Sequence, residues 1–93
     1  MLYAYIMGAK HKVHMLKDLI EFIVKELVGY PDQVVVVEKQ ENQSVLFEIQ
    51  VNDGDRGRLI GKEGKTIKAI RALIGVMEPA GQKVAIEIVK SPS

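Results

Sequence analysis

The chain has 93 residues, enough for one domain and too few for two independent cores, since a domain usually takes ~100 to 150 residues. Apolar residues make up 47% and charged residues 27%, with a formal net charge of +1, which excludes a disordered tail and a polycation. The absence of cysteine excludes disulfides and thiolate metal sites, so apolar burial must hold the fold.

No apolar run approaches the ~20 residues that a membrane-spanning helix needs. The apolar start of the chain, Met1 to Met7, is followed rather than preceded by basic residues, which is the reverse of a secretory signal. We therefore expect a cytoplasmic protein that does not enter a membrane. Residues 1–14 lie outside the clean periodicity that follows and form an unassigned N-terminal extension.

From Met15 onward, apolar residues recur at helical spacing and predict an amphipathic helix that ends near Val28. Gly29 is expected to supply a left-handed stop, and Pro31 prevents the helix from resuming. Phe22 is expected in the core. The predicted apolar face consists of Met15, Leu16, Leu19, Ile20, Ile23, Val24, Leu27 and Val28.

Two strands follow. Four successive β-branched residues favour an extended chain from Val34 to Lys39, and the run Ser44 to Val51 alternates between apolar and polar positions. The short polar turn between them, Glu41 to Gln43, predicts an antiparallel hairpin. The predicted buried face of the second strand is Val45, Phe47, Ile49 and Val51.

The second half of the chain predicts two helices and a strand. The acidic side chains in the turn 52–55 are expected to cap a short helix from about Asp55 to Ile60, with Leu59 and Ile60 pointing inward. A longer helix opens after Gly64 and stops at Pro79 and Gly81; its predicted apolar face is Ile67, Ile70, Leu73, Ile74 and Met77. Alternation predicts a third strand over 83–90, and residues 91–93 are expected to be a disordered tail.

This order, α-β-β-α-α-β, predicts a two-layer α+β domain with a three-stranded mixed sheet covered by helices on one face. A connection through two helices returns the chain parallel to the strand it left, by a right-handed crossover, so the strand 44–51 should lie in the middle. The residues predicted on the opposite face of the sheet are Val35, Val37, Leu46, Ala85 and Val89.

Basic residues concentrate in one segment. Between Arg56 and Arg71 there are six of them and a single acid, Glu63, a local charge of +5 in a nearly neutral chain. Such a segment is often only a solvated helix face, but here it surrounds two glycines three residues apart, where the backbone can approach an anion closely. The six are Arg56, Arg58, Lys62, Lys65, Lys68 and Arg71.

The sequence motifs of catalytic sites do not fit this segment. Gly64-Lys65-Thr66 ends like a Walker phosphate loop, but Leu59 stands where that loop needs its first glycine, and the turn follows a helix instead of a strand. The only histidines, His11 and His14, lie in the unassigned extension, and capping explains the nearby acids Asp53 and Asp55. We expect no enzyme, no metal and no cofactor.

The stretch from Gly57 to Ile70 resembles the signature of the KH domain. Its Gly-x-x-Gly loop, Gly61-Lys62-Glu63-Gly64, is preceded by Ile60 and followed, three residues on, by Ile67. The element order is similar to the type II KH topology of bacteria, and the whole of residues 15–90 resembles the small single-KH RNA-binding proteins of the KhpA type.

The resemblance implies a clamp on about four nucleotides of single-stranded RNA by this loop, with the bases in an adjacent apolar groove. Glu63 departs from an ideal phosphate loop, and the absence of aromatic residues from the groove predicts micromolar or weaker affinity. The implied function is a post-transcriptional regulator or RNA chaperone. The implied RNA-binding residues are Gly57, Arg58, Ile60, Gly61, Lys62, Glu63, Gly64, Lys65, Ile67, Lys68 and Arg71, with one edge of 83–88 beside them.

The competing hypothesis is a protein-interaction module that acts through the open sheet face or the N-terminal helix, with RNA binding incidental. The resemblance itself implies a partner, namely a second KH-containing protein of the KhpB or Jag type, or self-association.

Overall fold

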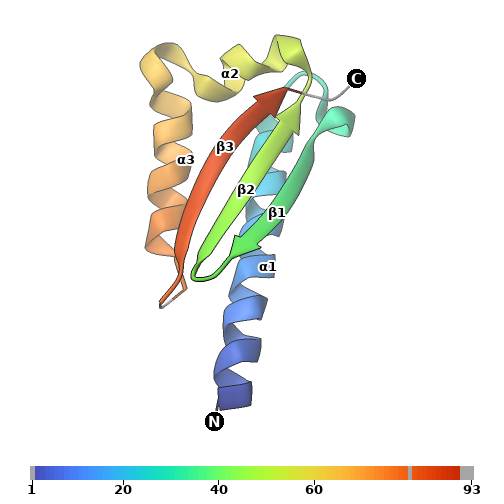
Figure 1. The fold of residues 1–93 in the computed structure, drawn as a ribbon. Helices are drawn as coiled ribbons and strands as arrows, with labels where there is room; N and C mark the ends of the chain where they lie inside the picture. Colours follow the sequence, from blue (N-terminus) through green and yellow to red (C-terminus); the bar gives the residue numbers. More distant parts are fainter. Residues whose placement is uncertain (1, 80, 91–93) are drawn as a thin grey trace.

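The structure, a computed structural model, describes the backbone of residues 2–79 and 81–90 and the side chains of residues 12–79 and 81–89 (Figure 1). The tail predicted for 91–93 lies outside the described residues. The helices and strands are α1 (Leu2–Leu27), β1 (Val35–Glu41), β2 (Ser44–Val51), α2 (Arg56–Ile60), α3 (Lys65–Val76) and β3 (Lys83–Lys90). Short 3-10 turns precede β1 (η1, Pro31–Gln33), α2 (η2, Asp53–Asp55) and α3 (η3, Lys62–Gly64). The predicted α+β order is confirmed.

The sheet has the order β1-β2-β3. β1 pairs antiparallel with β2, and β2 pairs parallel with β3, so the central position of β2 is confirmed. The hairpin turns at Asn42, whose φ of 51° is a left-handed conformation that asparagine tolerates better than most residues. The connection through α2 and α3 then carries the chain back to the start of the parallel strand (Figure 1).

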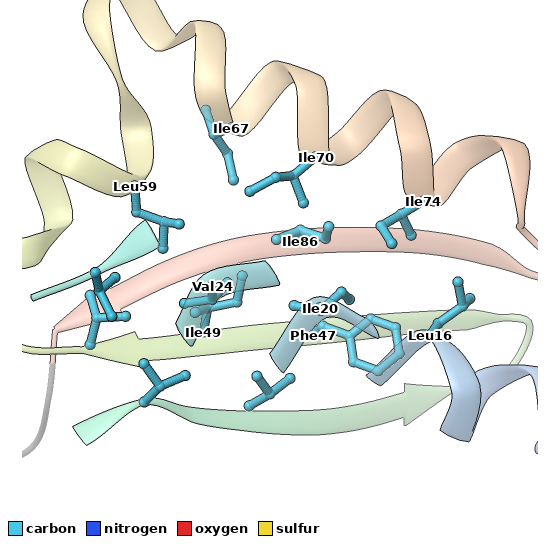
Figure 2. Packing of buried hydrophobic residues seen from close by; sticks show 14 of the residues in the cluster. Leu16, Ile20, Val24, Phe47, Ile49, Leu59, Ile67, Ile70, Ile74 and Ile86 are labelled. Carbon is cyan, nitrogen blue, oxygen red and sulfur yellow. The ribbon is translucent and has the colours of Figure 1, made fainter. Parts of the chain in front are cut away.

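The core lies between one face of the sheet and the helices. Figure 2 shows side chains of α1, α3 and α2 meeting those of the sheet. Every second residue of β2 from Val45 to Val51 is fully buried, as the alternation predicts. The labelled residues of this cluster are Leu16, Ile20, Val24, Phe47, Ile49, Leu59, Ile67, Ile70, Ile74 and Ile86.

Helix α1 begins well before the predicted start at Met15. It runs from Leu2, and Val13 is 1% exposed and belongs to the core cluster. Once the packed part of a helix has formed, each further residue adds a hydrogen bond at little cost, so a segment without proline can continue it. The first turns of α1 extend past the end of the sheet (Figure 1).

Several apolar residues that were predicted inside are exposed. Phe22, predicted in the core, is 64% exposed, because it stands two residues from the buried Ile20 and therefore about 200° around the helix. Ile60, Leu73 and Met77 are also more than a third exposed, at the margins of the buried faces of α2 and α3. The buried stripes are thus narrower than the apolar stripes of the sequence.

The end of α1 is fixed by a side chain distant in sequence. Asp55 is 2% exposed, and its two carboxylate oxygens accept hydrogen bonds from the backbone N–H of Gly29 at 2.9 Å and of Tyr30 at 3.1 Å. Both local predictions are therefore wrong: Gly29 does not adopt a left-handed conformation, and Asp55 does not cap α2 with its side chain. The carboxylate instead joins the end of α1 to the start of α2.

The sheet face away from the helices carries the predicted apolar residues, but polar ones separate them. Glu48 lies between Val37 and Glu87 across the strands, and it pairs with Lys39 at 3.1 Å. The three rows read Val35, Gln50, Val89; Val37, Glu48, Glu87; and Lys39, Leu46, Ala85.

We predict that Asp55→Ala lowers the free energy of unfolding by about 2 to 3 kcal/mol, because two partly buried N–H groups lose a charged acceptor. Urea unfolding followed by circular dichroism measures this loss. Asp53→Ala is the matched control: Asp53 is exposed and lies 4.0 Å from Arg56, so its removal should cost less than about 0.5 kcal/mol. Equal stabilities of the two variants would contradict the anchoring role of Asp55.

Candidate nucleic-acid interface

The predicted loop is a tight turn between α2 and α3. The N–H of Gly61 donates to the carbonyl of Gly57 at 2.9 Å, and the N–H of Gly64 donates to that of Gly61 at 3.1 Å. Three residues of the turn have positive φ: Gly61 at 79°, Glu63 at 57° and Gly64 at 75°. The backbone therefore reverses direction within four residues. This turn brings Gly61 and Gly64 close to the start of α3.

Gly61 is required by the turn itself. Its φ of 79° and ψ of 173° define a conformation that is almost restricted to glycine. A Cβ at this position would also lie 2.9 Å from the backbone nitrogen of Thr66, and its distance to the Thr66 hydroxyl would be shorter still. Thr66, which the sequence did not single out, thus packs against the loop where a side chain on residue 61 would stand.

Gly57 is different, because no contact with the described residues requires a glycine there. It lies inside α2 with an ordinary negative φ, and an added Cβ would meet no atom within 4 Å. Glycine in a helix costs about 0.5 to 1 kcal/mol relative to alanine. The chain therefore keeps a destabilising residue on an open surface beside the loop, where a ligand backbone would need the space.

The six basic residues of the segment divide into two groups. Three lie beside other parts of the protein: Arg56 pairs with Asp53 at 4.0 Å, Arg71 donates to the carbonyl of Ile86 at 3.2 Å, and Arg58 is exposed near Gly29 at the end of α1. The position of Arg58 suits the negative end of the α1 dipole.

The other three basic residues, Lys62, Lys65 and Lys68, are exposed and surround the loop. Among the residues that the structure describes, no ion pair involves them. Glu63 is exposed between them, and no side chain caps the N-terminus of α3. Three lysines without an ion pair among the described residues thus surround the turn.

The two isoleucines that flank the loop occupy different environments. Ile60 is 38% exposed and follows Gly57 by one helical turn, so both lie on the outer side of α2. Ile67 is 6% exposed and points into the core beside Ile70 (Figure 2). Of these two side chains, that of Ile60 alone offers apolar surface next to the loop.

Other kinds of site are not visible in the described part of the chain. No group of three or more histidine and acidic side chains in residues 12–79 and 81–89 is placed to hold a metal ion. None of the helices, within the residues described, is both long and apolar enough to cross a membrane. His14 is exposed on α1.

Comparison with known proteins gives one consistent family. Residues 17–88 match the family model "KhpA/KhpB, KH domain". The RNA-binding protein KhpA of Chlamydia trachomatis is 42% identical over 76 residues, which cover 81% of this chain and 97% of the relative. The RNA-binding protein KhpA of Thermotoga maritima is 36% identical over 75 residues, which cover 81% of this chain and 100% of the relative. The RNA-binding protein KhpA of Clostridium acetobutylicum is 40% identical over 75 residues, which cover 80% of this chain and 100% of the relative. No solved structure shows a significant match.

We predict that Gly61→Ala destabilises the protein by about 3 kcal/mol or more, since it combines a forbidden backbone conformation with a clash against Thr66. Gly64→Ala should cost only about 1 kcal/mol, because its φ of 75° is strained for alanine but its nearest neighbour is the flexible end of Lys68 at 3.8 Å. Thermal unfolding of both variants gives the comparison. A Gly61→Ala protein as stable as Gly64→Ala would show that the turn relaxes without cost.

Proposed function

Since this chain belongs to the KhpA/KhpB family of KH domains, we propose that it binds single-stranded RNA, with the loop from Gly61 to Gly64 holding the phosphate backbone. The relatives are named RNA-binding proteins, which supports RNA as the ligand. The expected extent is about four nucleotides, the reach of a Gly-x-x-Gly loop in this class of domain.

The observation that carries this proposal is the group of three lysines around the loop, Lys62, Lys65 and Lys68, which have no acidic partner among the residues described. Unpaired cations beside a glycine turn fit successive phosphates, and the start of α3 adds the positive end of a helix dipole. Arg56, which pairs with Asp53, and Arg58, which lies near the end of α1, are less suited to this role. We therefore expect two to four phosphate contacts.

The surface for the first nucleotides is the outer side of α2, where Gly57 leaves room and Ile60 offers an apolar contact. None of the three aromatic residues whose side chains the structure describes belongs to α2 or to the loop: Phe47 is fully buried in β2, Phe22 lies on α1, and Tyr30 follows α1. Stacking usually adds ~1 to 3 kcal/mol per base, so its absence predicts affinity in the micromolar range or weaker.

The proposal assigns the protein a binding role in the cytoplasm, as an RNA chaperone or post-transcriptional regulator, with no catalytic step and no cofactor. A partner with a KH domain, of the KhpB or Jag type, or a second copy of the chain is consistent with it. The competing role as a protein-interaction module through the sheet face is supported less, because Glu48 and Gln50 interrupt the apolar rows on that face.

We predict that Lys62→Asp lowers the affinity for a short single-stranded RNA at least tenfold at low salt, because a phosphate contact becomes a repulsion. The slope of log Kd against log salt should fall by about 0.7, the value for one phosphate of a single strand. The melting temperature should change little, since Lys62 is exposed and has no ion-pair partner in the described part of the chain. Fluorescence anisotropy at three salt concentrations measures both effects.

The control is an RNA duplex of the same length. A surface that contacts unstacked bases cannot accept paired ones, so the wild-type protein should bind the duplex more weakly than the single strand. Equal or tighter duplex binding, or a Lys62→Asp variant with unchanged affinity, would overturn the proposed function.

Gly57→Ala tests whether RNA approaches α2. Because the added Cβ meets no atom, this variant should be more stable than the wild type by about 0.5 to 1 kcal/mol, yet it should bind RNA at least threefold more weakly. Gly75→Ala, also in a helix and with open space around the added Cβ, should give the same stabilisation without loss of affinity. Urea unfolding and anisotropy titration of the pair separate the two effects. A Gly57→Ala protein with wild-type affinity would place the RNA elsewhere.

A further inference from the structure

Glu63 is an acidic residue in the middle of the basic loop. It is exposed, and it lies in the chain between Lys62 and Lys65. Its φ of 57° and ψ of 25° are left-handed, a conformation that glycine and asparagine adopt more readily than glutamate. In the part of the chain that the structure describes, the other residue with a positive φ that is not glycine is Asn42. The shape of the turn therefore does not explain a glutamate at this position.

Contacts within the protein do not explain Glu63 either. Among the described residues, its carboxylate takes part in no ion pair and no side-chain hydrogen bond, and no side chain caps the start of α3. The dipole of α3 favours a negative charge at this end, but it favours a bound phosphate in the same way. A phosphate held by the loop and the carboxylate of Glu63 therefore repel each other in a shared positive environment.

The backbone of RNA can offset this repulsion, whereas the backbone of DNA cannot. An ionised carboxylate only accepts hydrogen bonds. The phosphates and sugars within a DNA strand contain no hydrogen-bond donor, but each ribose of RNA carries a 2′-hydroxyl that donates. This hydroxyl is bonded to the carbon next to the one that carries the following phosphate. A strand whose phosphates lie at the loop therefore brings 2′-hydroxyls to the same place.

We propose that Glu63 accepts a hydrogen bond from a ribose 2′-hydroxyl and thereby makes the loop select RNA over single-stranded DNA. The inference rests on the proposed function. The lysines on either side of Glu63 attract the phosphates of RNA and of DNA equally, so their charge alone does not discriminate. The carboxylate lowers the affinity for both nucleic acids by repulsion, and the hydrogen bond returns that affinity to RNA only. Specificity thus arises from a group that disfavours the wrong ligand.

The test compares three oligomers of equal length, charge and base: rU8, 2′-fluoro-U8 and dU8. The 2′-fluoro sugar keeps the pucker of RNA but cannot donate a hydrogen bond, so it isolates the hydroxyl proton. Fluorescence anisotropy at one low salt concentration gives the three affinities. The wild-type protein should bind rU8 at least about fivefold more tightly than either of the other two, because the lost hydrogen bond has a charged acceptor.

Two variants separate the acceptor from the charge. Glu63→Met removes both at similar length, so 2′-fluoro-U8 should bind more tightly than it does to the wild type, and its affinity should approach that of rU8. Glu63→Gln keeps an acceptor oxygen without the charge, so rU8 should retain a preference of about twofold, as for a neutral hydrogen bond. Lys65→Met is the matched control: it should weaken binding of all three oligomers by a similar factor and leave the ratios unchanged.

The outcomes separate this inference from the proposed function. Equal wild-type affinity for rU8 and 2′-fluoro-U8 overturns the role of Glu63 and leaves RNA binding intact, even where dU8 binds weakly, since sugar pucker then selects. A ratio that persists in Glu63→Met overturns it as well, because Glu63 then acts through its charge or on the fold alone. Failure of the wild-type protein to bind any of the oligomers overturns the proposed function instead. Should Glu63→Met fail to fold, Glu63→Gln serves in its place, and its ratio should be at least about twofold below that of the wild type.

Discussion

The buried carboxylate of Asp55 is the contact on which the position of the loop depends. It holds the backbone N–H groups of Gly29 and Tyr30 at the end of α1, and it belongs to the turn that opens α2. α2 has only five residues, too few to be stable as an isolated helix. The loop at Gly61 therefore takes its position from α1 through Asp55, and from the core through Leu59, which is fully buried.

The loop adds a second constraint that is local. Gly61 fits against Thr66 at a distance that excludes any side chain, and its backbone conformation excludes other residues independently. The first glycine of the motif is thus explained by folding alone, with no ligand. The proposed function rests instead on residues whose described contacts do not explain them: the open Gly57 and the lysines 62, 65 and 68.

Those parts of the fold that depend on strand alternation were predictable from the sequence. The strands 44–51 and 83–90 have the predicted bounds, because each alternates along its whole length and one face is buried. Predictions that depended on contacts between distant segments were wrong. Nothing near Gly29 or Asp55 in the sequence indicates that they meet 26 residues apart, and nothing near Phe22 shows how wide the buried stripe of α1 is.

In the candidate site, too, the sequence predicts local features but not the contacts between distant segments. The sequence supplies a net charge of +5 between Arg56 and Arg71, but charge alone does not reveal which side chains are free. Arg56 pairs with Asp53, Arg71 donates to the carbonyl of Ile86, and Arg58 lies near the end of α1. The three that lie beside other parts of the protein are arginines, and the three that surround the loop are lysines. An arginine can bridge fixed groups with its planar fork, whereas a lysine stays a mobile point charge that adapts to a phosphate. We therefore expect the lysines at the loop, more than the arginines, to contact the phosphates of the proposed ligand.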